Sequence, residues 1–313
     1  MQDQCGRTIS YLRISVTDRC NYRCRYCMPA EGVEKHAHSE VCSFEELRNM
    51  AAAAVRCGVK KIRVTGGEPL VRRGIVDFCR LLKRIDGVEE LCLTTNGSLL
   101  PELAAPLKAA GVDRLNISLD TLRPERFAEI TRCGTLDEAL RGIEAAEAAG
   151  FVQLKLNCVL LGGVNEDEIV DFVALTREKP WQVRFIERMP MGVCTTYGAY
   201  LPARTVPERC PALEPIGSEG VASLYRLPEG KGTVGLITPM SHEFCGECSR
   251  IRITADGRLK PCLHSDAELP LRGLSGAALE DAIRRGILEK PAQHHLCAEG
   301  VTETHRAMNE IGG

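Results

Sequence analysis

The sequence predicts an α/β protein whose mostly parallel sheet carries functional groups along one edge. Six β-rich runs alternate with helix-like stretches between about residues 9 and 187. Parallel neighbours need a crossover segment, usually a helix, so this alternation implies a parallel sheet. Glycine-rich and polar residues follow several of the predicted strands directly, and parallel folds place their sites at this end of the strands. An open doubly wound sheet and a closed or partly closed barrel both fit this order.

Hydrophobic patterning and helix-terminal residues define the individual elements. Ser43 lies three residues before Glu46, which is the spacing of a capping box, and Gly58 follows the last turn of the same helix. The alternation stops near residue 190, so we predict one domain over residues 1–190 and a second over residues 191–313. The predicted strands are Tyr11–Val16, Lys61–Thr65, Glu90–Thr94, Arg114–Leu119, Val152–Val159 and Gln182–Glu187. The predicted helices are Ser43–Cys57, Ile75–Ile85, Pro101–Ala110, Pro124–Thr131, Leu136–Ala149 and Glu166–Thr176.

The composition excludes several classes of function. Forty basic and 42 acidic residues leave a formal net charge of -2, whereas a DNA-binding or membrane-surface protein would show a basic excess. Aromatic residues make up 4% of the chain, which argues against a base-stacking surface for single strands. No apolar run approaches the ~18 residues of a membrane span, and charged residues near the N-terminus predict no secretory signal peptide. We therefore expect a cytoplasmic globular protein with neither nucleic acid nor membrane as partner.

Sixteen cysteines are many for a chain without an export signal, where metal-binding or catalytic thiols explain them better than disulfides. Residues 20–27 read CNYRCRYC, so Cys20, Cys24 and Cys27 follow the first predicted strand. Structural zinc is normally closed by four ligands. Three cysteines can instead hold a [4Fe–4S] cluster and leave one iron open to a substrate or cofactor. A zinc site completed by a distant His or Cys remains the alternative.

A second cysteine group lies in residues 244–263. Cys245 and Cys248 are separated from Cys262 by a run that predicts a β-hairpin, with a turn at Ala255-Asp256-Gly257. The hairpin would return Cys262 to the other two thiols. Three ligands again fit a cluster with an open iron, and a zinc ribbon closed by Cys297 or His264 is the alternative.

Two arginines accompany the second cysteine group. Arg250 and Arg252 lie two residues apart in the first strand of the hairpin, so they are expected on one face. Beside a metal centre such a pair could bind phosphate oxygens. The alternative is a solvated strand face.

The first cysteine group resembles the signature of the radical S-adenosylmethionine superfamily, because Cys-x3-Cys-x2-Cys carries an aromatic residue, Tyr26, before its last cysteine. The resemblance implies that the open iron of the cluster chelates S-adenosylmethionine. Gly66-Gly67-Glu68-Pro69 is similar to the glycine-rich loop that meets the methionine part of this cofactor in the superfamily. Ser118 likewise resembles a contact to the ribose or carboxylate of the cofactor, and Met189 resembles a contact to its adenine. The cofactor contacts implied by the resemblance are Tyr26, Gly67, Ser118 and Met189.

A closer resemblance extends from about residue 6 to the last residue. LRISVTDRCNYRCRYCMP, GGEPLVR, CGECSRIRIT, LKPCL and the terminal IGG stand in the order found in the radical enzymes that cyclise GTP in molybdenum cofactor biosynthesis. That family implies an α/β fold, a partial (β/α)6 TIM-like barrel with a C-terminal α+β cap that carries a second [4Fe–4S] cluster. It also implies conversion of GTP to 3′,8-cyclo-7,8-dihydro-GTP by a 5′-deoxyadenosyl radical.

The matched motifs imply individual roles. The second cluster, held by the second cysteine group, would bind the guanine base, and the first cluster would generate the radical. The C-terminal tail would reach into the barrel. Arg184 is a further candidate for substrate binding. The implied GTP contacts are Arg13, Arg63, Thr94, Lys155, Arg250 and Arg252. The residues expected to serve catalysis directly are Arg250, Arg252, Gly312 and Gly313.

The family resemblance also implies partners. These are an electron donor of the flavodoxin or ferredoxin type and a downstream cyclic pyranopterin monophosphate synthase. The sequence does not fix the oligomeric state, and a homodimer remains open. Two alternatives come from other classes, a peptide-modifying radical enzyme with an auxiliary cluster and a zinc-stabilised binding protein without redox chemistry.

Overall fold

A single twisted sheet organises the chain. The structure is a computed structural model that describes residues 1–32, 37, 39–191, 196–242, 244–294 and 302–312. Over these residues the strand order is β12-β11-β10-β1-β2-β3-β4-β5-β6-β9-β8-β7. The sheet is open in the described part of the chain, with β12 and β7 as its edges.

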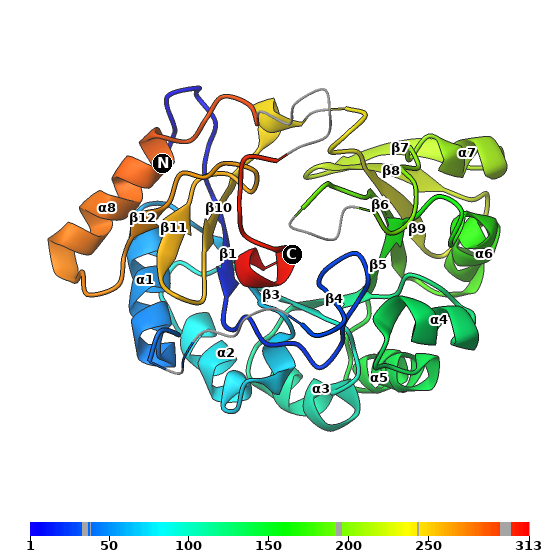
Figure 1. The fold of residues 1–313 in the computed structure, drawn as a ribbon, viewed down its shortest axis with the longest axis horizontal. Coiled ribbons are helices and arrows are strands. Elements are labelled where there is room, and N and C mark those ends of the chain that lie inside the picture. Colours follow the sequence, from blue (N-terminus) through cyan, green and yellow to red (C-terminus); the bar gives the residue numbers. More distant parts are fainter. Residues whose placement is uncertain (33–36, 38, 192–195, 243, 295–301, 313) are drawn as a thin grey trace.

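The central six strands are the parallel core that the sequence predicts. They are β1 (Tyr11–Ser15), β2 (Lys61–Thr65), β3 (Glu90–Thr95), β4 (Arg114–Ser118), β5 (Lys155–Leu160) and β6 (Gln182–Glu187). All five neighbouring pairs run parallel. The helices that follow these strands lie along the outer side of the curved sheet (Figure 1). They are α1 (Phe44–Arg56), α2 (Ile75–Lys83), α3 (Leu100–Ala109), α4 (Pro124–Thr131), α5 (Leu136–Ala148) and α6 (Ile169–Glu178).

Local sequence explains where these elements begin. The Ser43 hydroxyl accepts a hydrogen bond from the Glu46 amide at 3.1 Å, and the Glu46 carboxylate accepts one from the Ser43 amide at 2.7 Å. This confirms the predicted capping box of α1. The predicted strand that began at Val152 in fact begins at Lys155, because Val152 is 69% exposed and lies in the preceding loop. The first turn predicted for α6, Glu166–Glu168, is a 3₁₀ turn.

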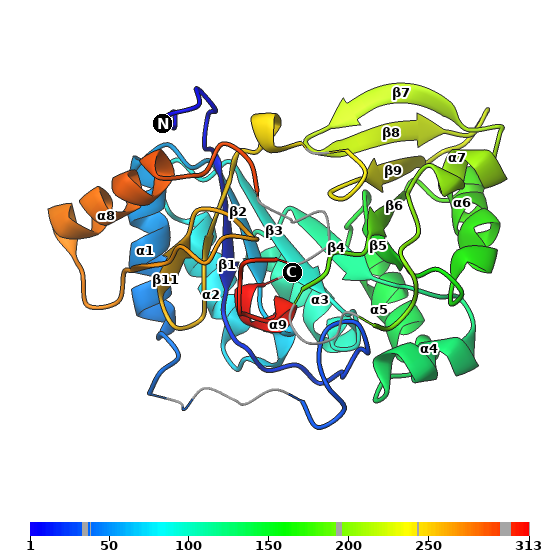
Figure 2. The ribbon, with the colours of Figure 1, turned by 45° about the horizontal axis from the view of Figure 1, so that its top comes forward.

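The two ends of the sheet come from the C-terminal part of the chain (Figure 2). On one side β10 (Arg250–Ile253) pairs parallel to β1, and β11 (Arg258–Lys260) and β12 (Leu269–Pro270) follow antiparallel. On the other side β9 (Thr233–Ile237) pairs parallel to β6, and β8 (Ala222–Arg226) and β7 (Glu214–Glu219) follow antiparallel. The sequence predicts the hairpin β10–β11, but it does not predict the three strands β7, β8 and β9. The described helices of this part are α7 (Thr205–Arg209), α8 (Gly276–Leu288) and α9 (Met308–Ile311).

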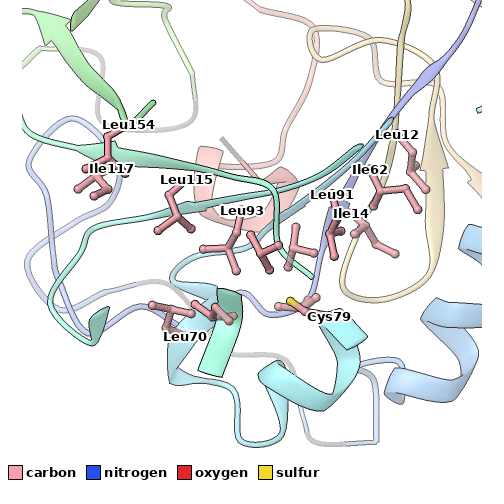
Figure 3. Close-up of a cluster of buried hydrophobic side chains, with 14 of the residues drawn as sticks. Leu12, Ile14, Ile62, Leu70, Cys79, Leu91, Leu93, Leu115, Ile117 and Leu154 are labelled. Carbon is pink, nitrogen blue, oxygen red and sulfur yellow. The ribbon is translucent and has the colours of Figure 1, made fainter. Parts of the chain in front are cut away.

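The main apolar core lies between the sheet and its outer helices. Figure 3 shows Leu12, Ile62 and Leu91 among the buried side chains of neighbouring strands. Burial of such a layer, at about 25 cal/mol per Å² of apolar surface, stabilises the sheet from its outer face. The inner face is therefore free to carry polar groups.

None of the helices in the described residues has both the length and the apolar character of a membrane span.

Candidate active site

The inner face of the sheet borders a cavity of about 500 Å³. All six cysteines of the two groups line it, although residues 27 and 245 are 218 positions apart in the chain. The cavity also brings together every other described residue of the predicted site except Gly312. These residues are Arg13, Tyr26, Arg63, Gly67, Thr94, Ser118, Lys155, Met189, Arg250 and Arg252.

The first cysteine group lies on the loop after β1, against the glycine-rich loop after β2. The Gly67 amide donates to the Thr17 carbonyl at 2.7 Å, and the Glu68 amide donates to the Arg19 carbonyl at 2.8 Å. A Cβ on Gly67 would lie 2.4 Å from the Arg19 carbonyl oxygen. Gly67 therefore allows close packing of its loop against the backbone of Asp18 and Arg19, directly before Cys20.

Tyr26 is fixed by a buried carboxylate. Its hydroxyl donates to Asp120 Oδ2 at 2.6 Å, and Asp120 Oδ1 accepts from the Val159 amide at 2.8 Å. Burial raises the pKa of Asp120 to about 6. Ser118, at the end of β4, and Met189, just after β6, line the same cavity.

The second cysteine group is held by two buried cations. Arg7 donates to the Cys245 carbonyl at 2.8 Å and to the Ala292 carbonyl at 2.9 Å. Lys290 donates to the Arg250 carbonyl at 3.0 Å and to the Pro261 carbonyl at 2.7 Å. Because Pro261 directly precedes Cys262, Lys290 ties both strands of the hairpin together beside their thiols.

The donor sets fit iron–sulfur clusters. Burial raises the pKa of Cys20 to about 11 and that of Cys24 well above its ordinary value, so these thiols need a bound cation to become thiolates. For Cys248, burial acts in the same direction, but Lys290 and Arg250 outweigh it and lower the pKa. Among the described residues, no three His, Cys, Asp or Glu side chains are placed to hold a single metal ion. A [4Fe–4S] cluster takes each thiolate on a different iron, so its cysteines need not converge on one point.

Basic side chains form rows across the cavity face of the sheet. In the strand register Arg13 of β1 stands opposite Arg252 of β10 on one side and Arg63 of β2 on the other. Further along, Lys155 of β5 and Arg184 of β6 also line the cavity. Burial, and next Arg252, hold the pKa of Arg13 well below its ordinary value.

This crowding of cations has a clear electrostatic consequence. Burial, and next Arg250, lower the pKa of Arg252 to about 10. Burial would raise the pKa of Tyr11, but Arg63, Arg13 and Arg250 together bring it to about 8. Buried like charges repel one another, so this cluster of arginines favours an anionic ligand in the cavity.

The C-terminal segment enters the same region. Arg252 Nη1 donates to the Gly312 carbonyl at 2.6 Å, and Asn309 Nδ2 donates to the Asp18 carbonyl at 3.1 Å. A Cβ on Gly312 would lie 2.1 Å from Thr65 Oγ1. Figure 1 shows the C-terminal end within the arc of the strands. Gly313 and Cys297, both singled out from the sequence, lie outside the described residues.

Sequence reasoning missed several polar residues of the cavity. Lys61 follows the same alternation as Arg63, so its place on the inner face could have been found from β2 alone. Asn116 and Asn157 face the cavity with buried side-chain oxygens that have no hydrogen-bond partner among the described residues. Glu219 also lines the cavity, but it comes from the unpredicted strand β7, so no sequence signal placed it there.

Two family models cover most of the chain. The model described as "Radical SAM superfamily" matches residues 14–176, which is more than half of the chain, and "Molybdenum Cofactor Synthesis C" matches residues 181–296. The fold and the two cysteine groups thus belong to an enzyme of the radical SAM superfamily.

Full-length relatives narrow the assignment. A GTP 3′,8-cyclase of Alkaliphilus oremlandii is 46% identical, with all of both chains covered. One of Peptoclostridium acidaminophilum is 49% identical over 99% of this chain and 98% of the relative, and one of Moorella thermoacetica is 47% identical over all of both chains. The chain belongs to the GTP 3′,8-cyclase family.

Solved structures show the same fold at low identity. Streptococcus suis SuiB bound to S-adenosylmethionine superimposes with a TM-score of 0.67 at 15% identity, covering 89% of this chain and 68% of that one. Coproporphyrinogen III oxidase from Escherichia coli, described as a radical SAM enzyme, gives a TM-score of 0.52 at 12% identity over 72% of this chain and 57% of that one.

Proposed function

We propose that this protein converts GTP to 3′,8-cyclo-7,8-dihydro-GTP as the first step of molybdenum cofactor biosynthesis. Full-length identity to GTP 3′,8-cyclases supports the activity, and the match to the molybdenum cofactor synthesis model supports the pathway. The observation that carries the proposal is the single cavity that both cysteine groups and the row of cations share.

The cofactors of this family are [4Fe–4S] clusters and S-adenosylmethionine. We assign the first cluster to Cys20, Cys24 and Cys27, and the second cluster to the second cysteine group. The ligands of the second are Cys245, Cys248 and Cys262. When bound, the first cluster and S-adenosylmethionine would supply a 5′-deoxyadenosyl radical that takes the ribose 3′ hydrogen of GTP; C3′ would then bond to C8 of guanine, and one electron from the reductant together with one proton would complete the 7,8-dihydro ring.

The protein's own residues position the two ligands. Tyr26, held by Asp120, with Gly67, Ser118 and Met189, would bind S-adenosylmethionine near the first cluster. The arginines of β1, β2 and β10, with Thr94 and Lys155, would bind the triphosphate and orient the ribose. Charge-assisted hydrogen bonds to phosphate contribute about 1.5–3 kcal/mol each. Holding both reactants in one geometry is the larger part of what such a site supplies.

The C-terminal tail and the curved sheet would close the site. We propose that β1–β6 with their helices form a partial (β/α)6 barrel, and that the region after residue 190 caps it and carries the second cluster. Arg252 then has two tasks, because it faces the cavity and also holds the Gly312 carbonyl. Exclusion of water by the docked tail would protect reactive intermediates. A flavodoxin- or ferredoxin-type donor and a cyclic pyranopterin monophosphate synthase are the proposed cytoplasmic partners.

Anaerobic reconstitution tests the proposal. Two clusters correspond to about eight irons per chain. With GTP, S-adenosylmethionine and a low-potential reductant, the reconstituted protein should form 3′,8-cyclo-7,8-dihydro-GTP, and ATP should not replace GTP. A colourless protein with stoichiometric zinc, or iron-loaded protein that leaves GTP unchanged while cleaving S-adenosylmethionine, would contradict it.

A further inference from the structure

A carboxylate from the unpredicted hairpin reaches the basic face of the cavity. Glu219 is the last residue of β7 and is joined to Ala222 by the two-residue loop Gly220-Val221, with a φ of 60° at Gly220. The tight loop brings the carboxylate over β4, β5 and β6. Glu219, Gly220 and Val221 all line the cavity.

Four donors from three strands meet this one carboxylate. Oε1 accepts from Lys155 Nζ at 2.5 Å and from Arg114 Nη1 at 3.1 Å. Oε2 accepts from Gln182 Nε2 at 3.0 Å and from Arg184 Nη2 at 3.2 Å. Each lone-pair direction of the carboxylate therefore has a partner, which fixes its position.

Two other carboxylates of the cavity, Glu68 and Glu187, are engaged differently. Glu68 accepts from the Leu70 and Asn96 amides and from the Thr95 hydroxyl. Glu187 accepts from backbone amides and from the Ser241 hydroxyl. Within the part of the chain that the structure describes, Glu219 is the cavity carboxylate with ion pairs to the basic residues of the lining.

We propose that Glu219 is a positioning residue for the substrate's phosphates, which holds Lys155 charged and aimed into the cavity through a fixed ion pair. The inference rests on the proposed function, because it takes GTP as the ligand. Lys155 is 5% exposed in its side chain, so it keeps its proton only with a partner nearby. An ion pair between a phosphate-binding lysine and a glutamate is also required in protein kinases, where it sets the lysine in place.

The charges around Lys155 explain why the partner matters near neutral pH. Burial, and next Arg184, lower the pKa of Lys155 to about 8, although the Glu219 carboxylate opposes both effects. Without the carboxylate the pKa must fall further, and each unit below the working pH removes about tenfold of the protonated form. The charged groups facing Lys155 from the neighbouring strands are Arg114 of β4, Arg184 of β6 and Glu219 of β7.

GTP binding to the reconstituted protein tests the inference, measured anaerobically by calorimetry at pH 6.5 and pH 8.0. Glu219→Gln keeps the shape of the side chain and removes its charge. We expect the Kd for GTP to rise about tenfold at pH 8.0 and clearly less at pH 6.5, where Lys155 recovers its proton. Glu219→Asp should recover part of the affinity.

Two further variants separate a positioning role from a structural one. Glu214→Gln, on the exposed start of the same strand, should leave the Kd unchanged at both pH values. In a Lys155→Met background, Glu219→Gln should lose most of its effect and its pH dependence. A Glu219→Gln protein that binds GTP as tightly as the wild type, or more tightly, or with an equal loss at both pH values, overturns the inference. Failure of the wild type to bind GTP would instead overturn the proposed function.

Discussion

A methyl group on Gly312 should release the C-terminal tail from the cavity. In Gly312→Ala the new Cβ would lie 2.1 Å from Thr65 Oγ1 and 3.0 Å from Thr65 Cβ, on a backbone whose φ is 83°. The left-handed conformation costs about 1 kcal/mol for alanine, and overpacking in a buried site costs about 1–3 kcal/mol. Together they predict that the equilibrium constant for docking of the tail falls roughly 30-fold or more, at about 1.4 kcal/mol per tenfold.

Hydrogen exchange and product formation report this release. Amide protection over residues 302–312 should fall and the rate of cyclised product should drop with it, while the iron content stays at the wild-type value. Gly273→Ala is the matched control, because Gly273 has a φ of 82° with no atom within 4 Å of the added Cβ. Gly273→Ala should be destabilised only by the cost of a positive φ for alanine, without any clash of the added Cβ. Wild-type turnover and unchanged tail protection in Gly312→Ala would refute this account of the tail.

Three further predictions concern the clusters, the arginines and the chain end. Cys24→Ser should abolish reductive cleavage of S-adenosylmethionine, whereas Cys245→Ser should retain cofactor binding and lose GTP turnover; cyclisation at the wild-type rate in Cys245→Ser would make the second group structural. Arg250→Ala should weaken GTP binding on the order of tenfold to a hundredfold, and Arg252→Ala should also lower tail protection, since it loses the hydrogen bond to the Gly312 carbonyl. Unchanged Kd values with unchanged iron would show that neither arginine binds GTP. Deleting the terminal Gly-Gly pair should leave cluster content intact and strongly reduce product, and full-rate product would show that cyclisation does not need the docked chain end.

Local sequence determined the parallel part of the fold. Strand runs such as Lys61–Thr65 and Gln182–Glu187 have the predicted bounds, because alternating polar and apolar residues specify the two faces of each strand. The same reasoning placed Arg250 and Arg252 on one face, and both line the cavity. That two cysteine groups far apart in sequence line one cavity could be predicted only through the family resemblance.

The part of the site that could not be predicted depends on long-range pairing. Strand β7 reads EPIGSE and is largely exposed, so it carries no buried alternation to reveal it. Its place at the sheet edge is set by pairing with β8, and only that pairing brings Glu219 to Lys155. Most of the remaining described cysteines are buried, but Cys5 and Cys133 are exposed because they lie outside the strands and helices.

Transfer of the substrate's 3′ hydrogen tests the central claim most directly, namely that one cavity holds GTP between the two cysteine groups. The reconstituted protein would be supplied with GTP deuterated at C3′, S-adenosylmethionine and reductant, and 5′-deoxyadenosine would be analysed by mass spectrometry. The account predicts one deuterium in the 5′-deoxyadenosine formed with the cyclised product. Unlabelled 5′-deoxyadenosine alongside that product, or 5′-deoxyadenosine formed at the same rate without GTP and no cyclised product, would contradict it.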